Sequence, residues 1–165
     1  AFLFCCYAGM RYSDFTNLSK KNIVDINQET WLIYKSVKTG TEVRLPLYLL
    51  FAGKGIVILN KYRNNLEDFF RLRDNSNINK DLIIIAKLAG LSKKISFHTA
   101  RHTNATLLIY NGVNITTVQK LLGHKSVKTT QVYTNIMDMT IVHDLEKMKQ
   151  AALGIKKKTD NSFNK

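Results

Sequence analysis

The stretch HTARHTNATLLIYNGVNITTVQKLLGHKSVKTTQVYT, which covers residues 98–134, decides the fold class of this chain. Its first part predicts a helix over residues 99–110, because Asn111 and Gly112 follow as a turn signal that stops helices. In its second part, apolar residues are spaced for one helix face and stand between helix-capping residues. The stretch therefore predicts a domain whose main elements are helices.

Capping residues divide the second part into two helices. Asn114 can cap the first, because its side chain can accept a hydrogen bond from a free backbone N–H, and Gly123 can end it. Ser126 can cap a second, short helix that holds Tyr133. We therefore expect His124 to lie in the turn between two helices.

Residues 22–44 have a different period. Three short runs, NIVDI, TWLIYKSV and EVRLPL, are rich in β-branched and aromatic residues, and turn-forming residues stand between them. They predict a three-stranded antiparallel sheet that Pro46 closes. Helices are expected elsewhere, over residues 2–8, 56–70, 78–91 and 140–153, and residues 11–18 are expected to form a turn that enters a short helix. The predicted fold class is mainly α with a small three-stranded antiparallel sheet, an α+β arrangement.

Length and composition set the organisation of the chain. Its 165 residues suffice for one domain, predicted over residues 1–153, and for a basic tail over residues 154–165 that we expect to be disordered. No apolar run reaches the roughly 18 residues of a membrane span. The apolar opening AFLFCCYAG lacks a basic flank and is interpreted as a core helix of a fragment, not a signal peptide. Adjacent Cys5 and Cys6 offer no disulfide framework and indicate a reducing cytoplasm.

Positive charge is the strongest global feature. The formal net charge is +13, and residues 82–137 contain no Asp or Glu. The cationic residues of this region are Lys87, Lys93, Lys94, Arg101, Lys120, Lys125 and Lys128. A surface of one sign attracts polyanions and speeds their encounter, so this distribution favours a nucleic-acid partner. Charge alone carries no specificity and also fits a merely soluble basic protein.

Two histidines and an arginine open the quoted stretch. His98 and Arg101 are three residues apart, so on a helix they share a face and can converge on one ligand atom. His98 and His102, four apart, also suggest a zinc site, but Thr99 stands where such motifs have glutamate. The acid-free region offers no carboxylate to complete that site. We therefore expect neither a metal nor a cofactor, and we expect His102 to turn toward packing.

The polar candidates suit phosphoryl transfer without a metal. Guanidinium groups bind phosphate oxygens in bidentate fashion and offset the charge of a pentacovalent transition state. A tyrosine can be the nucleophile, but its pKa of about 10 means that it needs help to lose a proton. An imidazole can give that help, and a hairpin lysine can protonate the leaving oxygen. The residues that could act in this way are Arg11, Lys38, His98, Arg101, His124 and Tyr133.

This set, in this order, resembles the tyrosine recombinases, also called phage-type integrases. The resemblance covers residues 8–135 and is carried by Arg11, Lys38, His98-Thr99-Ala100-Arg101, Leu122-Gly123-His124 and Tyr133. It implies the catalytic-domain fold of that family without the family's N-terminal DNA-clamping domain. It also implies a site-specific recombinase that cleaves and rejoins double-stranded DNA, for integration or excision of a mobile element, at the nucleoid in the cytoplasm.

The resemblance implies a role for each residue of the set. Tyr133 would attack a DNA phosphodiester and form a 3′-phosphotyrosyl bond that leaves a free 5′-hydroxyl. Arg11 and Arg101 would hold the scissile phosphate, and Asp14, three residues after Arg11, would orient the active-site arginine. Lys38 would be the general acid toward the 5′-oxygen.

The two histidines and four lysines complete the expected site. His98 would assist proton transfer at the nucleophile, and His124 would donate a hydrogen bond to a phosphate oxygen. Both roles come from the resemblance. The lysines expected to hold the DNA backbone are Lys93, Lys94, Lys125 and Lys128.

Two alternative functions and one question of assembly stay open. A type IB topoisomerase would use the same chemistry to relax supercoils as a monomer. A catalytically inactive DNA-binding accessory protein would carry a defective site, whereas no member of the set is missing. The helix expected over residues 140–153 would either pack on its own domain or dock on a neighbouring protomer. We expect a homotetramer on synapsed DNA, with a monomer as the alternative state of the isolated fragment.

Overall fold

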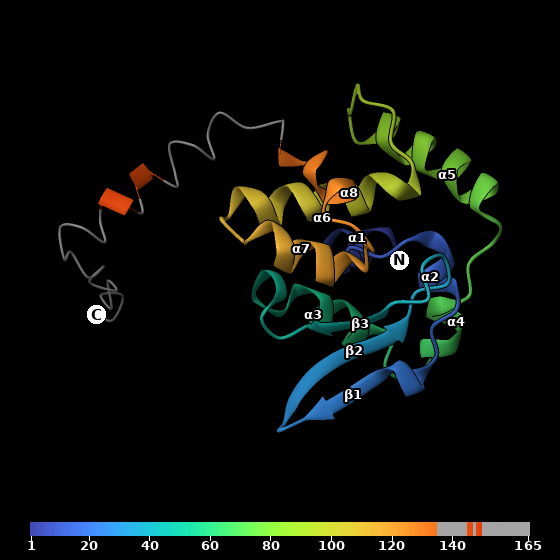
Figure 1. Cartoon of the computed structure of the whole chain (residues 1–165). Coiled ribbons are helices and arrows are strands. Elements are labelled where there is room, and N and C mark those ends of the chain that lie inside the picture. The colour runs from blue at the N-terminus through green and yellow to red at the C-terminus, as the bar shows by residue number, and fades with distance from the viewer. Residues whose placement is uncertain (135–144, 147, 150–165) are drawn as a thin grey trace, which may run out of the picture.

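The computed structural model describes residues 1–134, 145–146 and 148–149, and these form a helical domain with one small sheet (Figure 1). In chain order the elements are α1 (Phe2–Ala8), α2 (Tyr12–Thr16), the 3₁₀ helix η1 (Lys20–Asn22), β1 (Ile23–Ile26), β2 (Glu29–Lys35), β3 (Glu42–Pro46), the 3₁₀ helix η2 (Leu50–Gly53), α3 (Lys54–Lys61), α4 (Leu66–Phe70), α5 (Asn75–Leu88), α6 (Phe97–Tyr110), α7 (Ile115–Leu122) and α8 (Lys128–Gln131). The predicted fold class is confirmed.

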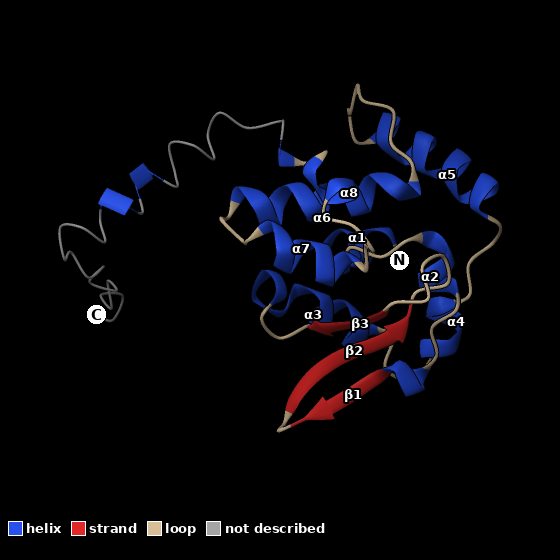
Figure 2. Ribbon diagram, viewed as in Figure 1, coloured by secondary structure: helices blue, strands red, loops and turns tan. Residues whose placement is uncertain are grey.

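The sheet is a meander with the strand order β1-β2-β3, and both strand pairs are antiparallel (Figure 2). Asn27 and Gln28 connect β1 to β2 with positive φ angles of 52° and 65°, the geometry of a two-residue type I′ hairpin turn. Trp31 pairs with Pro46, so β3 ends at the proline that the sequence marks. The three strands predicted over residues 22–44 are therefore confirmed.

The hydrophobic core is rich in aromatic rings. The Phe15 ring of α2 lies 5.4–6.2 Å, centroid to centroid, from the rings of Phe4, Phe69, Phe70 and Phe97. Tilted and edge-to-face pairs of this kind each contribute about 0.5–1.5 kcal/mol beyond the area that they bury. The cluster joins α1, α2, α4 and α6, and so fixes the turn between α1 and α2 relative to α6.

The C-terminal end of α1 passes very close to α6 and α7. Gly9 follows α1 with a φ of 67°, and a Cβ there would lie 2.5 Å from Asn104 Oδ1 and 2.8 Å from Leu122 Cδ2. Only glycine fits such an approach in this conformation. Buried Asn104 of α6 donates hydrogen bonds to the carbonyls of Cys6 and Tyr7, at 3.1 and 2.9 Å. One polar side chain of α6 thus satisfies two of the last carbonyls of α1.

The prediction of a single helix over residues 56–70 is wrong. The segment forms two helices, α3 and α4, which residues 62–65 separate. Asn64 and Asn65 favour a turn, because their side chains compete for backbone hydrogen bonds. The turn lets the ring of Tyr62 stack on Phe69, at 4.5 Å between centroids and an interplanar angle of 24°. This tertiary contact outweighs the helical spacing of the apolar residues.

Two other helices begin earlier than their patterns predict. The helix expected over residues 78–91 is α5, and Asp74 caps its start by accepting a hydrogen bond from a backbone N–H at 3.1 Å. The helix expected over residues 99–110 is α6, which starts at Phe97, directly after its N-cap residue Ser96. Ser96 and Thr99 form a capping box there. In both cases a cap residue, not the apolar period, sets the boundary.

The end of the chain is described only in part. The helix expected over residues 140–153 lies outside the described residues except for 145–146 and 148–149, which are helical. The tail expected over residues 154–165 lies outside them entirely. In the part of the chain that the structure describes, no helix is both long and apolar enough to cross a membrane.

Candidate active site

Arg101 is a buried cation held by backbone carbonyls. Its side chain, on α6, is only 1% exposed. Nη1 donates to the carbonyl of Gly9 at 2.7 Å, and Nη2 donates to that of Leu122 at 2.5 Å. No carboxylate of the described residues forms an ion pair with it. Burial, with a smaller contribution from the Arg11 charge, lowers the pKa of Arg101 to about 10. The guanidinium is thus fixed in direction, still charged at neutral pH and free to attract an anion.

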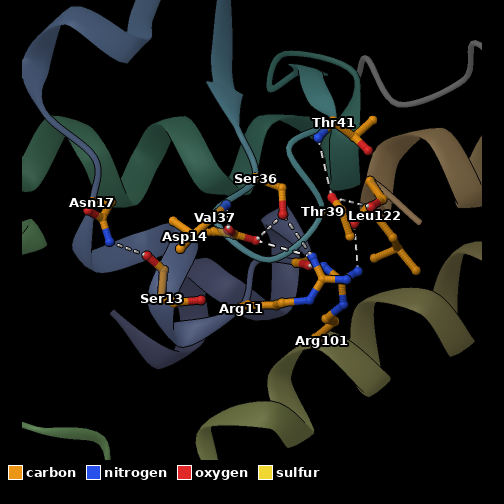
Figure 3. Close-up of polar contacts among 12 residues, drawn as sticks. Arg11, Ser13, Asp14, Asn17, Ser36, Val37, Thr39, Thr41, Arg101 and Leu122 are labelled. Atoms are coloured by element: carbon orange, nitrogen blue, oxygen red, sulfur yellow. Dashed lines mark hydrogen bonds and ion pairs between the residues drawn. The ribbon is translucent and has the colours of Figure 1, made fainter. Parts of the chain in front are cut away.

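Arg11 brings a second guanidinium to the same place. It precedes α2, and its Nη1 donates to Asp14 Oδ2 at 3.3 Å and to Ser36 Oγ at 3.2 Å (Figure 3). Asp14 is buried, and its other oxygen accepts a hydrogen bond from the backbone N–H of Val37 at 2.8 Å. The predicted contact between Asp14 and an active-site arginine is therefore present. In Figure 3 the guanidinium groups of Arg11 and Arg101 lie near each other.

Lys38 is exposed in the turn between β2 and β3, as predicted. Thr39 anchors this turn by donating from Oγ1 to the carbonyl of Gly123 at 3.1 Å. The same glycine, with a φ of 62°, approaches β3 so closely that a Cβ would lie 2.6 Å from Val43 Cγ2. The hairpin and the end of α7 therefore form one unit. The positive charge of Lys38 contributes to lowering the pKa of the site's histidines, after larger effects of burial and of other charged groups.

His124 follows Gly123 and is buried. Its backbone N–H donates to the carbonyl of Gln119 at 3.0 Å, and its Nδ1 lies 2.9 Å from Oγ1 of Thr130. Burial, and after it the charge of Arg101, lowers the pKa of His124 to about 4. The imidazole is therefore neutral at neutral pH, with one ring nitrogen bonded to Thr130 and the other available to a ligand.

His98 and His102 lie on one face of α6, one helical turn apart. Their ring centroids are 4.6 Å apart and the rings are nearly perpendicular, at 88°. Burial is the largest cause that lowers the pKa of His98, followed by the charges of His102 and Arg101. Among the described residues, no group of three or more His, Cys, Asp or Glu side chains is placed to bind a metal ion. The expectation that His102 turns toward packing is wrong, because its side chain is exposed and its ring contacts other site residues.

Tyr133 lies just beyond the short helix α8. The expected cap Ser126 accepts a hydrogen bond from the N–H of Lys128 at 3.3 Å, but the helix begins after Val127 and ends before the tyrosine. The Tyr133 side chain is buried, and its ring lies 5.4 Å from that of His102. Burial raises its pKa, whereas Arg101 and then Arg11 lower it. Burial and the two arginine charges thus act on the pKa of the phenol in opposite directions.

The four lysines expected to hold DNA are exposed and lie in two places. Two of them, Lys125 and Lys128, lie between His124 and Tyr133. The other two, Lys93 and Lys94, lie in the loop between α5 and α6. Exposure is compatible with a role in binding, and that role stays a prediction.

Known proteins resemble this chain in sequence. Residues 1–139 match the phage integrase family. The chain belongs to this family. It is 30% identical over 159 residues to tyrosine recombinase XerC of Rickettsia prowazekii, and the match covers 91% of this chain and 49% of that protein. It is 34% identical over 134 residues to tyrosine recombinase XerA of Saccharolobus solfataricus, covering 78% and 42%. The chain thus spans about half the length of these relatives.

The fold agrees with a solved member of the phage integrase family. A crystal structure of XerA recombinase superposes with a TM-score of 0.69 and 28% identity, over 87% of this chain and 55% of the other. The expected family and the expected catalytic-domain fold are therefore confirmed.

Three polar residues that support the site were not predicted from the sequence. Ser36 bridges Arg11 and Asp14, Thr130 bonds the ring of His124, and Asn104 ties α6 to α1. Asn104 could have been found, since an amide on the apolar face of an integrase helix needs a partner. Ser36 and Thr130 leave no such signal, because each is a small polar residue in a turn or short helix.

Proposed function

We propose that this chain is the catalytic part of a site-specific DNA recombinase. Tyr133 attacks a phosphodiester, a bond forms between its phenolic oxygen and phosphorus, and the bond from phosphorus to the 5′-oxygen breaks. The product is a 3′-phosphotyrosine and a free 5′-hydroxyl. The reverse reaction with the 5′-hydroxyl of another strand rejoins the DNA, as integration or excision of a mobile element requires.

One observation carries this proposal. Arg11 and Arg101, from distant parts of the chain, bring two guanidinium groups close together (Figure 3), and their charges oppose the rise that burial causes in the pKa of Tyr133. Arg101 is buried among backbone carbonyls without an ion pair to any described carboxylate. Burying a cation of this kind costs free energy unless an anion pairs with it. A phosphodiester is a suitable anion, because its oxygens match the planar fork of a guanidinium. We infer that the phosphate binds at these guanidinium groups with the phenol of Tyr133 as its attacking group.

Protonation states suit the proposed roles. The raised pKa of Tyr133 keeps its phenol protonated at neutral pH, so a base must take the proton. The lowered pKa of His98 keeps that imidazole neutral and able to accept it. Lys38, on its exposed hairpin, gives a proton to the leaving 5′-oxygen. We assign Nδ1 of neutral His124, 2.9 Å from Oγ1 of Thr130, as the acceptor of that pair, so that Nε2 donates to a phosphate oxygen.

A nicked DNA duplex tests the proposal. A nick beside the cleaved bond lets a short fragment diffuse away after attack, so the covalent intermediate accumulates. Since the recognised sequence is unknown, the substrate is a pool of nicked duplexes with varied sequence around the nick. A labelled protein–DNA adduct on a denaturing gel is the expected result. Tyr133→Phe should abolish it without weakening DNA binding, and Tyr110→Phe, on the exposed end of α6, should leave it unchanged.

The same substrates separate the alternatives. A type IB topoisomerase would change the linking number of a circle without joining two duplexes, and an inactive accessory protein would bind without forming an adduct. No observation on the described residues favours either of these. An adduct that persists in Tyr133→Phe, or binding with no adduct from any duplex, would refute the proposed function.

The proposed partner is double-stranded DNA, bound mainly through its phosphates. The +13 net charge supports this, and such binding should weaken steeply as salt is raised. We assign the backbone contacts to Lys93, Lys94, Lys125 and Lys128. The proposed assembly is a homotetramer on synapsed DNA, acting at the nucleoid in the cytoplasm, with the catalytic domain at residues 1–153.

A further inference from the structure

The direction of the Tyr133 ring is weakly set by its own backbone. The residue lies two positions beyond Gln131, the last residue of α8, and so outside regular structure. Its backbone N–H donates to the carbonyl of Thr130 at 3.1 Å. A single backbone bond leaves the side-chain torsions free, so the ring must be held by what packs against it. The side chain is nevertheless only 5% exposed.

His102 supplies an aromatic contact to that ring. The two ring centroids are 5.4 Å apart and the planes meet at 61°, an edge-to-face arrangement. His102 is itself exposed on α6 and directly follows Arg101, whose guanidinium is fixed by two backbone carbonyls. The imidazole therefore belongs to a segment of α6 that the two hydrogen bonds of Arg101 anchor.

A second ring also contacts His102. The ring of His98 lies 4.6 Å away at 88°, so His98, His102 and Tyr133 form a row of three rings with His102 in the middle. The row connects the proposed base to the proposed nucleophile. A change in the middle ring would disturb the ring of Tyr133 without touching either guanidinium.

We propose that His102 is a positioning residue that aims the phenol of Tyr133 at phosphorus. Edge-to-face pairs are directional, because the positive edge of one ring meets the negative face of the other. In-line attack depends on such aim, since a displacement of about 1 Å can lower a rate on the order of a hundredfold. This inference rests on the proposed function, and the role belongs to the ring of His102 and not to its charge.

Two substitutions separate the ring from the charge. His102→Leu removes both, and His102→Phe removes the charge but keeps a flat ring. Both abolish to the same extent the effect of the imidazole charge on His98, so the difference between them reports the ring alone. Tyr110→Leu is the matched control, because it removes a half-exposed ring from the last turn of the same helix.

The rate of adduct formation on nicked DNA is the first readout. His102→Leu should lower this rate about three- to tenfold, which corresponds to the free energy of one aromatic pair. Its DNA affinity should match that of the unaltered protein and of Tyr110→Leu, and its melting temperature should fall by no more than a few degrees, as the loss of aromatic pairs predicts. His102→Phe should restore the rate to within about twofold. A Phe variant as slow as the Leu variant, or a Leu variant at full rate, would overturn the proposal.

The second readout needs no cleavage, so it keeps the inference distinct from the proposed function. Labelling with 3-fluorotyrosine gives a ¹⁹F resonance for each of the seven tyrosines, and Tyr133→Phe identifies the one at the nucleophile. This resonance should shift in His102→Leu, where the neighbouring ring is lost, and much less in His102→Phe. An unchanged resonance in the Leu variant would refute the contact even in a protein that forms no adduct. A shifted resonance without any adduct would uphold the contact and refute the function.

Discussion

Arg101→Lys is the substitution that most sharply tests how the site holds an anion. The arginine bonds two buried carbonyls at once, those of Gly9 and Leu122, at 2.7 and 2.5 Å. A lysine has one nitrogen and cannot reproduce this planar fork, so at least one carbonyl loses its partner. An unsatisfied buried carbonyl costs about 1–3 kcal/mol in the free energy of unfolding. For a domain of this size, a loss of about 2 kcal/mol lowers the melting temperature by about 4–8 °C.

The lysine would also lose charge that the arginine keeps. The site lowers the pKa of Arg101 to about 10, chiefly through burial. The ordinary pKa of lysine, about 10.4, is roughly two lower than that of arginine. The same burial would therefore bring the pKa of a lysine at this position close to the working pH. Burial disfavours the protonated form, so the residual activity should fall as pH rises from about 7 to about 9. At pH 7 the rate of adduct formation should already be on the order of a hundredfold lower, as for the loss of a group that stabilises transition-state charge.

Three measurements on one purified variant check these values. Thermal unfolding gives stability, adduct formation on nicked DNA gives the rate, and its pH profile gives the protonation state of the lysine. Arg44→Lys is the control, since Arg44 is exposed on β3 and, among the described residues, pairs only with exposed Glu42. If Arg101→Lys forms the adduct within about threefold of the normal rate, with a flat pH profile, then neither the fork nor the retained charge matters.

Other predictions concern the turn that holds His124. Thr130→Val keeps the shape but leaves the ring nitrogen of His124 without its partner, so adduct formation should fall about tenfold and stability by about 1–2 kcal/mol; an unchanged rate would contradict this. Gly123→Ala should lower the free energy of unfolding by about 1–3 kcal/mol in a denaturant titration, because its φ is positive and Val43 obstructs a Cβ. Gly90→Ala, with a similar φ and open space, is its control and should cost less; equal losses would exclude the obstruction. Stability should also fall as pH drops from about 6.5 to about 4, because unfolded chains bind protons there that folded His124 does not. His124→Asn should flatten this part of a pH-dependent denaturation series, and an unaltered slope would disprove the assignment.

Local signals account for what the sequence predicted of the fold. Helix α7 runs between Asn114, whose side chain accepts from the N–H of Thr116, and Gly123, which takes a left-handed conformation. Both signals act within a few residues, so they can be read from the chain directly. The break between α3 and α4 could not, because the stacking of Tyr62 on Phe69 is a contact that helical spacing does not encode.

Candidate site residues can be chosen from the sequence, but the contacts that hold them cannot. Residue types and their order along the chain pointed to Arg11, Arg101 and Tyr133. The groups that fix Arg101 are backbone carbonyls 92 and 21 residues away, and carbonyls leave no trace in a sequence. The sequence misplaces His102 as a packing residue, because helical periodicity says which face a residue shares but not which ring approaches that face.

The most direct test of the central claim is to identify the residue that becomes linked to DNA. The adduct is trapped on nicked duplex and digested with protease and nuclease, and the modified peptide is sequenced by mass spectrometry. The account predicts that Tyr133 carries the added mass of a nucleotide, linked to the phenolic oxygen through its 3′-phosphate. A nucleotide linked to Tyr110, to Tyr7 or to any residue other than Tyr133 would contradict it.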